Sequence, residues 1–198
     1  MNLPNKLTLV RCILTPIFLA CVVIDFPFHY GAALLIFIAA SLTDYFDGTI
    51  ARKRNLVTNL GKFLDPLADK ALTTAAFIGF VYMFASRSLP WALFIILARE
   101  FAVTSVRLLA AKDGVVVAAS FSGKLKTVMQ MVSIIYMLAF RQAIRFVVVR
   151  EALGTTGILW GSRIGLILIW ISVVATVVSG IQYIWQLRHY FKEEKAES

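Results

Sequence analysis

Four aspartates occur as two pairs within stretches of sequence that are otherwise strongly apolar. Asp44 and Asp47 stand three residues apart, and Asp65 and Asp69 stand four residues apart. Each pair therefore lies on one face of a helix. An ionised carboxylate at membrane depth costs roughly 2.5–3.5 kcal/mol, so four of them together require cationic compensation. The pattern indicates that this part of the chain binds metal or carries out chemistry.

Carboxylate oxygens without a His or Cys nearby favour a hard divalent cation, Mg²⁺ or Mn²⁺. Four carboxylates are more than one Mg²⁺ usually takes, so two ions, or one ion and a free base, fit better. Two-metal sites clamp the attacking and leaving oxygens of a phosphoryl displacement. Gly48 and Ala51 share the helix face of Asp44 and leave it without bulk, which suits a nucleotide lying against the backbone.

The composition indicates what kind of element carries these aspartates. Of the 198 residues, 60% are hydrophobic and 16% are charged, whereas soluble domains have about 45–50% apolar residues. Apolar runs of about 20 residues recur, which is the length of a helix that crosses a bilayer. The sequence therefore predicts an all-α, polytopic membrane protein that forms a single domain over residues 1–198.

Six transmembrane helices are expected, over residues 7–27, 31–53, 61–85, 90–111, 120–140 and 162–187. Residues 141–160 are expected to form a longer, partly apolar connection. A short polar hairpin makes the second and third helices antiparallel neighbours, which brings both aspartate pairs close to one membrane interface. His29 and His189 stand at segment ends and are expected at the surface.

The net charge of +9 is distributed unevenly. Most lysines and arginines fall on the face that carries the hairpin and both termini, which makes that face cytoplasmic by the positive-inside rule. Anionic membrane lipids are expected partners, whereas no motif supports nucleic-acid binding. Arg87 falls on the other side, as do Arg141, Arg145, Arg150 and Arg163. The last four are candidate contacts for outer-leaflet headgroups.

The aspartates belong to the pattern Asp-x₂-Asp-Gly-x₂-Ala-Arg-x₈-Gly-x₃-Asp-x₃-Asp, which resembles the signature of the CDP-alcohol phosphotransferase family. Every fixed position is matched, by Asp44, Asp47, Gly48, Ala51, Arg52, Gly61, Asp65 and Asp69. The resemblance implies transfer of a substituted phosphate from a CDP-linked donor to an alcohol, with release of CMP. It also implies that Asp44, Asp47 and Asp65 bind two divalent ions. Asp69 would be a shared ligand and the general base.

Further segments resemble one branch of this family, the bacterial phosphatidylglycerophosphate synthases. They are residues 2–11, 61–70, 98–107 and 123–127. Members of this branch join CDP-diacylglycerol to sn-glycerol 3-phosphate in the bacterial inner (cytoplasmic) membrane. The resemblance implies a homodimer. The six predicted helices and the positive-inside rule place the active site and both termini of this multi-pass protein on the cytoplasmic side. The CDP-lipid site would include Asn5, Thr8, Gly48, Ala51, Arg52 and Gly61.

Glycerol 3-phosphate carries a dianion and needs cationic donors near the metals. Arg107 is about a turn from the cytoplasmic end of its helix, and Lys124 and Lys126 open the next one on the same side. These three residues are the expected acceptor site. Arg99 and Glu100 are in mid-helix, about 100° apart, so they are not expected to form a simple pair. A network inside the bundle and a substrate contact both remain open for them.

The residues of the proposed acceptor site fit more than one acceptor. An enzyme of the same family with phosphatidylglycerol or inositol phosphate as acceptor would fit most of these residues. A divalent-cation transporter would instead place its carboxylates near mid-membrane on several helices, whereas here they fall near one face on two. Asn5, Thr8 and Arg11 either cap the first helix or approach the headgroup.

Overall fold

The computed structural model describes residues 3–54, 59–84, 86–112 and 121–197. At residues 3–7, 44–54, 59–67, 69, 111–112 and 187–197 it describes the helix backbone without the side chains. Within these ranges the chain forms six helices and no strand, which confirms the predicted all-α class.

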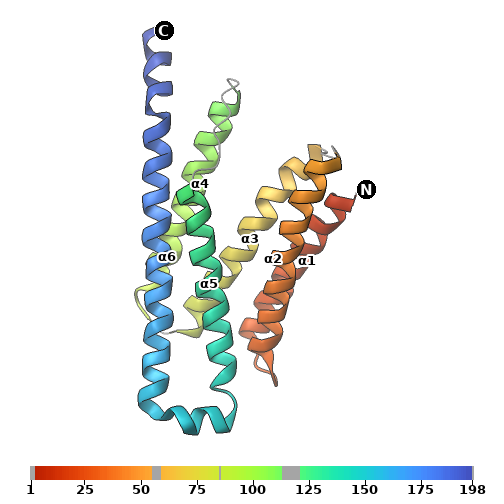
Figure 1. Cartoon of the computed structure of the whole chain (residues 1–198), viewed down its shortest axis with the longest axis vertical. Coiled ribbons are helices and arrows are strands. Elements are labelled where there is room, and N and C mark those ends of the chain that lie inside the picture. The colour runs from red at the N-terminus through yellow and green to blue at the C-terminus, as the bar shows by residue number, and fades with distance from the viewer. Residues whose placement is uncertain (1–2, 55–58, 85, 113–120, 198) are drawn as a thin grey trace. The chain divides into compact units, whose positions relative to one another are not determined.

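The helices are α1 (Leu3–Val23), α2 (His29–Arg54), α3 (Asn59–Met83), α4 (Leu89–Lys112), α5 (Phe121–Ala143) and α6 (Val147–Glu197) (Figure 1). The first five begin and end within four residues of the predicted bounds. The chain divides into two compact units. Unit 1 consists of residues 1–89 and 134–162, and unit 2 consists of residues 90–133 and 163–198.

The sixth helix differs from the prediction. The loop expected over residues 141–160 is wrong, because α5 continues to Ala143 and α6 begins at Val147. Within α6, Gly154 has φ 59° and ψ −176°, which is not helical. This backbone conformation is almost restricted to glycine. A short helical segment before Gly154 therefore meets the long remainder of α6 at a bend (Figure 1).

In unit 1, α1 packs against both α2 and α3 (Figure 1). Phe18 of α1 and Phe37 of α2 are buried, with ring centroids 6.0 Å apart. One turn further along α1, Cγ1 of Val22 would lie 2.7 Å from a Cβ atom at Gly79 of α3. The absence of a side chain at Gly79 therefore lets α1 and α3 approach closely, and α1 holds α2 and α3 together.

This close approach predicts the effect of a small substitution. Gly79→Ala is expected to destabilise unit 1 by about 1–3 kcal/mol, because overpacking forces the two helices apart. The measurement is the thermal unfolding temperature of the purified protein. Adding Val22→Ala removes the atom that the new methyl group meets, so the double variant should recover part of the loss. A Gly79→Ala protein as stable as the original would contradict the packing described for α1 and α3.

The turn between α1 and α2 buries a histidine. His29 is 3% exposed, and its Nδ1 donates a hydrogen bond of 2.9 Å to the Cys21 carbonyl oxygen. The expected surface position of His29 is therefore wrong, while the side chain of His189 lies outside the described residues. Nearby, the Gly31 amide donates a buried 2.9 Å bond to Oε1 of Gln142, which ties the start of α2 to the end of α5.

Unit 2 contains α4, the first part of α5 and most of α6. Val103, Ala110 and Tyr183 form its buried apolar cluster. Between α5 and α6, Nε2 of Gln130 donates to Oγ1 of Thr176 at 3.2 Å, and both side chains are buried. Hydrogen bonds between side chains thus join helices in a largely apolar unit.

Among the described residues, one helical stretch, Val147–Gln186, is long and apolar enough to cross a membrane. Three shorter apolar helical stretches are Thr8–Val23, His29–Thr43 and Lys70–Met83. Large apolar side chains are also exposed at helical spacing along α4, at Trp91, Phe94, Phe101 and Leu108. Such an extended apolar surface is unusual for a soluble monomer and suits contact with lipid or with another protein.

Candidate active site

The motif lies at two consecutive helix ends. Its first five positions, 44–52, occupy the last turns of α2, and its last three, 61–69, occupy the first turns of α3. Four residues link Arg54 to Asn59, so these two helix ends lie within about 18 Å of each other. Since α1 packs against both helices, the motif belongs to one packed body.

The two aspartate pairs lie at matching depths along their helices. Asp47 comes seven residues before Arg54, and Asp65 comes six residues after Asn59. At 1.5 Å per residue, these positions are about 10 Å and about 9 Å from the linked helix ends. Asp44 and Asp69 are each ten residues from those ends, or about 15 Å. The aspartates therefore form two levels along α2 and α3: Asp47 with Asp65, and Asp44 with Asp69.

The side chains of the predicted donor and metal site lie outside the described residues. They are Asn5, Asp44, Asp47, Gly48, Ala51, Arg52, Gly61, Asp65 and Asp69. Among the side chains that are described, no group of three His, Cys, Asp or Glu residues gathers as metal ligands. Metal binding is therefore inferred from two observations: the matching depths of the aspartate backbone positions, and the preference of carboxylates for hard cations.

Thr8 and Arg11 of α1 are both 1% exposed. Thr8 precedes Val23 by 15 residues, and Asp44 follows His29 by the same number, so the short turn between α1 and α2 places them at similar depths. Because α1 begins at Leu3, Thr8 and Arg11 lie inside the helix, which excludes capping, one of the two alternatives left open for them. A buried guanidinium needs anionic or carbonyl partners, and α2 and α3 carry aspartates at this end of the unit.

In unit 2, Arg99 and Glu100 form a side-chain network. Arg99 donates from Nη1 to Oε1 of Glu100 at 3.1 Å and from Nη2 to Oγ of Ser179 at 2.6 Å. Nζ of Lys126 contacts the same Glu100 oxygen. Arg99 and Glu100 were not expected to form a simple pair. Their side chains do contact each other, but as part of a network that includes Ser179 and Lys126. This contact favours the network interpretation over a direct substrate contact.

The three predicted acceptor-site cations differ in their surroundings. Arg107 is exposed, and its guanidinium carbon lies 5.5 Å from the centroid of the buried Tyr183 ring. Lys124 is also exposed. Lys126 is 12% exposed and bound to Glu100. Arg107 and Lys124 thus present their charges outward, whereas a carboxylate fixes the position of Lys126.

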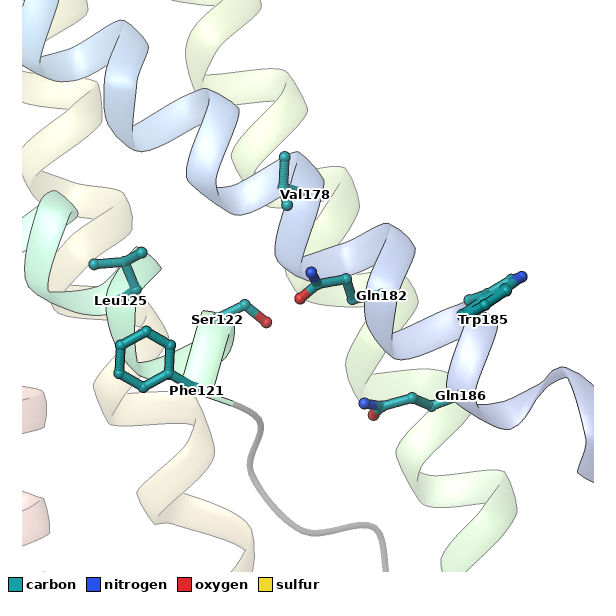
Figure 2. A pocket seen from close by; sticks show the side chains of 7 residues that line it. All are labelled: Phe121, Ser122, Leu125, Val178, Gln182, Trp185 and Gln186. Atoms are coloured by element: carbon teal, nitrogen blue, oxygen red, sulfur yellow. The ribbon is translucent and has the colours of Figure 1, made fainter.

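A cavity of about 610 Å³ opens between α5 and α6 in unit 2, and it was not predicted. Ser122 and Gln182 point toward each other across it, and Gln186 lies one turn further along α6 (Figure 2). Phe121 and Trp185 supply apolar lining. The signal in the sequence was the pair Gln182 and Gln186, four residues apart in an otherwise apolar helix.

Comparisons with known proteins show which sequences this chain resembles. Residues 1–178 match the sequence profile of the CDP-alcohol phosphatidyltransferase family. The chain is 40% identical over 196 residues to the CDP-diacylglycerol–glycerol-3-phosphate 3-phosphatidyltransferase of Bacillus subtilis, covering 92% of this chain and 93% of that protein. It is 36% identical over 192 residues to the Rickettsia bellii protein of the same name, covering 96% and 97%.

A solved structure shares the fold. The apo crystal structure of Mycobacterium tuberculosis phosphatidylinositol phosphate synthase superposes with a TM-score of 0.56 at 21% identity, covering 91% of this chain and 88% of that one. The profile match spans the motif and five of the helices completely, and the relatives align over nearly their full length. The chain belongs to the CDP-alcohol phosphatidyltransferase family.

Proposed function

We propose that this chain is an integral-membrane enzyme that transfers the phosphatidyl group from CDP-diacylglycerol to sn-glycerol 3-phosphate and releases CMP. The relatives named for this activity, at 40% and 36% identity, support the choice of reaction. The structural observation that carries it is the pairing of aspartate positions at two matching depths on α2 and α3.

The donor set fits a pair of hard divalent ions, Mg²⁺ or Mn²⁺. Four carboxylates offer more oxygens than one such ion takes, and two neighbouring helices supply them in equal numbers. Asp44, Asp47, Asp65 and Asp69 would hold the ions, which supply charge neutralisation for the donor pyrophosphate and for the departing CMP.

The transfer needs a base at the acceptor. Asp69 accepts the proton of the attacking glycerol 3-phosphate hydroxyl. The hydroxyl oxygen bonds to the phosphorus that carries the diacylglycerol group, while the bond from this phosphorus to the CMP oxygen breaks. CMP leaves with the bonding electron pair. One phosphorus–oxygen bond forms and one breaks.

The CDP-lipid donor lies along the small residues of the motif. Gly48, Ala51 and Gly61 leave room for cytidine against the helix backbones, and Arg52 contributes a positive charge. Asn5 and Thr8 reach the donor from α1; the burial of Thr8 at the depth of Asp44 supports its place there.

The acceptor phosphate binds Arg107, Lys124 and Lys126. The outward charges of Arg107 and Lys124 support this assignment, since a dianion entering from water meets them first. Glu100 holds the Lys126 side chain in one position. Phosphate binding therefore costs less side-chain conformational entropy at Lys126.

Arg107→Ala is expected to raise the apparent KM for glycerol 3-phosphate by about 10-fold to 100-fold, because one or two charge-assisted hydrogen bonds to the acceptor phosphate are lost. The KM for CDP-diacylglycerol and kcat should change little. Steady-state kinetics in detergent–lipid micelles measure all three values. Arg87→Ala removes an exposed arginine elsewhere and serves as the control. A rise in the KM for the lipid alone would show that the acceptor site is misplaced.

The membrane arrangement also belongs to this proposal. All six helices cross the bacterial inner membrane, both termini lie in the cytoplasm, and the active site faces the cytoplasm. The chain forms one domain and assembles as a homodimer. The exposed apolar row on α4 supports burial against lipid or against a second copy.

An acceptor panel tests the proposed reaction. Purified enzyme is given CDP-diacylglycerol, a divalent cation and one acceptor at a time: glycerol 3-phosphate, inositol phosphate or phosphatidylglycerol. CMP release is expected with glycerol 3-phosphate. Release with inositol phosphate alone, or with phosphatidylglycerol alone, would reassign the acceptor and leave the transfer chemistry standing. Release with none of them, in the presence of metal, would contradict the proposed reaction.

A further inference from the structure

A cavity of about 720 Å³ lies in unit 1, far along α2 from the motif. The turn between α1 and α2 forms one wall, and the junction of α5 with α6 forms the other. Asp44 follows the first residue of α2 by 15 positions, or about 22 Å of helix. The proposed transfer uses no residue that lines this cavity.

The charged side chains of the cavity favour an anion. Arg145 and Arg150 line it together with one acid, Asp25, so the cationic groups are in excess. Nη2 of Arg145 donates to Oδ1 of Asp25. The Arg145 side chain is 39% exposed and the Asp25 side chain is 75% exposed. An ion pair this exposed stabilises a protein little, so a phosphate can replace the carboxylate at small cost.

Guanidinium groups are well suited to that exchange. Their planar donors match two oxygens of a phosphate at once. The Arg145 guanidinium carbon also lies 5.9 Å from the centroid of the Tyr30 ring, and the same ring lies under Arg141 at 5.8 Å. The aromatic contact orients Arg145 before any anion arrives.

The walls of the cavity are built rigidly. The buried bond from the Gly31 amide to Gln142 joins the two walls. Phe28 has φ +66°, a conformation that is uncommon for a bulky residue and is concentrated at functional sites. Its ring fills the space at Gly31, where a Cβ atom would overlap the ring. A surface turn that serves only as a connection has no need of this strain.

The rim of the cavity is aromatic. Phe26, Phe28 and Phe146 line it and are 37%, 51% and 52% exposed. A free phosphate ion would make no favourable contact with three exposed phenyl rings. The glycerol backbone and first methylenes of a lipid would instead cover these rings. Aromatic side chains gather at the level of lipid headgroups in membrane proteins.

We propose that this cavity binds the phosphate of an anionic phospholipid in the leaflet opposite the active site, through Arg145 and Arg150. The inference requires the chain to lie in a bilayer, as the proposed function does, but it uses no step of the transfer reaction. It can therefore fail while the proposed function stands, and the reverse also holds.

Lipid binding is measured with full-length protein in phosphatidylcholine nanodiscs that contain a trace of spin-labelled phosphatidylglycerol. The double variant Arg145→Gln/Arg150→Gln is expected to lower the affinity about tenfold, as the loss of charge-assisted hydrogen bonds to phosphate requires. Arg87→Gln, which removes an exposed arginine outside the cavity, should leave the affinity unchanged.

Asp25→Asn gives a change of opposite sign. Removing the carboxylate that competes for Arg145 should tighten binding about threefold. This variant keeps both arginines, so the test stands even if the double arginine variant folds poorly. Weaker binding in Asp25→Asn, or unchanged binding in the double variant, would overturn the proposal. Displacement of the labelled lipid by inorganic phosphate at equal concentration would overturn the assignment to a lipid.

Discussion

Asp69→Asn is expected to lower kcat by about 10²- to 10⁴-fold, the usual contribution of a general base. The amide keeps one oxygen at the same place but cannot accept the proton of the glycerol 3-phosphate hydroxyl. CDP-diacylglycerol should still bind, because the three other motif aspartates remain. The two measurements are CMP release at saturating substrates and equilibrium binding of CDP-diacylglycerol with Mg²⁺ present.

A loss of turnover with retained CDP-diacylglycerol binding would support Asp69 as the general base. Asp69→Glu supplies a matched variant, since it restores a carboxylate one methylene further out, and it should recover part of the lost turnover. Turnover of Asp69→Asn close to that of the original protein would exclude Asp69 as the base. Loss of CDP-diacylglycerol binding in parallel with turnover would instead make Asp69 chiefly a metal ligand.

The parts of the fold that depend on local sequence were predicted well. Apolar runs between polar turns located α1 to α5, and the motif spacing located both aspartate pairs on consecutive helices. The start of α6 was missed because Arg150, Glu151 and two glycines make residues 147–160 resemble a loop. The structure keeps these residues helical and confines the break to Gly154.

Features that depend on tertiary contacts could not be predicted. His29 was expected at the surface, but a positive φ at Phe28 turns the chain so that the imidazole reaches the Cys21 carbonyl eight residues earlier. Arg99 and Glu100 were not expected to form a simple pair, but the partners of their network, Ser179 and Lys126, are far away in sequence and could not be identified from it. No local pattern encodes such contacts.

The same limit applies to the site. The identity and spacing of the aspartates predicted the hard-cation chemistry and the family, and the family is confirmed. Ser122 and Gln182 were missed because they come from helices 60 residues apart in sequence. The three acceptor cations remain a prediction. Only Lys126 gains a described ionic partner, and this partner is a carboxylate of the protein itself.

Neutralising a metal ligand should raise or lower the unfolding temperature according to whether the divalent ion is present. Asp44→Asn and Asp65→Asn are each expected to weaken metal activation by more than about 100-fold, because changes to groups behind a ligand already cost about 10- to 100-fold. Without divalent cations, however, four neighbouring carboxylates repel one another. Each variant should then unfold at a temperature equal to or higher than that of the original protein.

Adding Mn²⁺ should reverse this order. At about 100 times its dissociation constant, a ligand stabilises the folded state by about 2.7 kcal/mol, and the variants should gain far less than the original protein. Asp25→Asn, which changes the exposed aspartate just before α2, is the control and should gain as much as the original. If Asp44→Asn and Asp65→Asn instead lowered the unfolding temperature equally with and without Mn²⁺, these aspartates would be structural. The two levels of carboxylates on α2 and α3 would then not form a metal site.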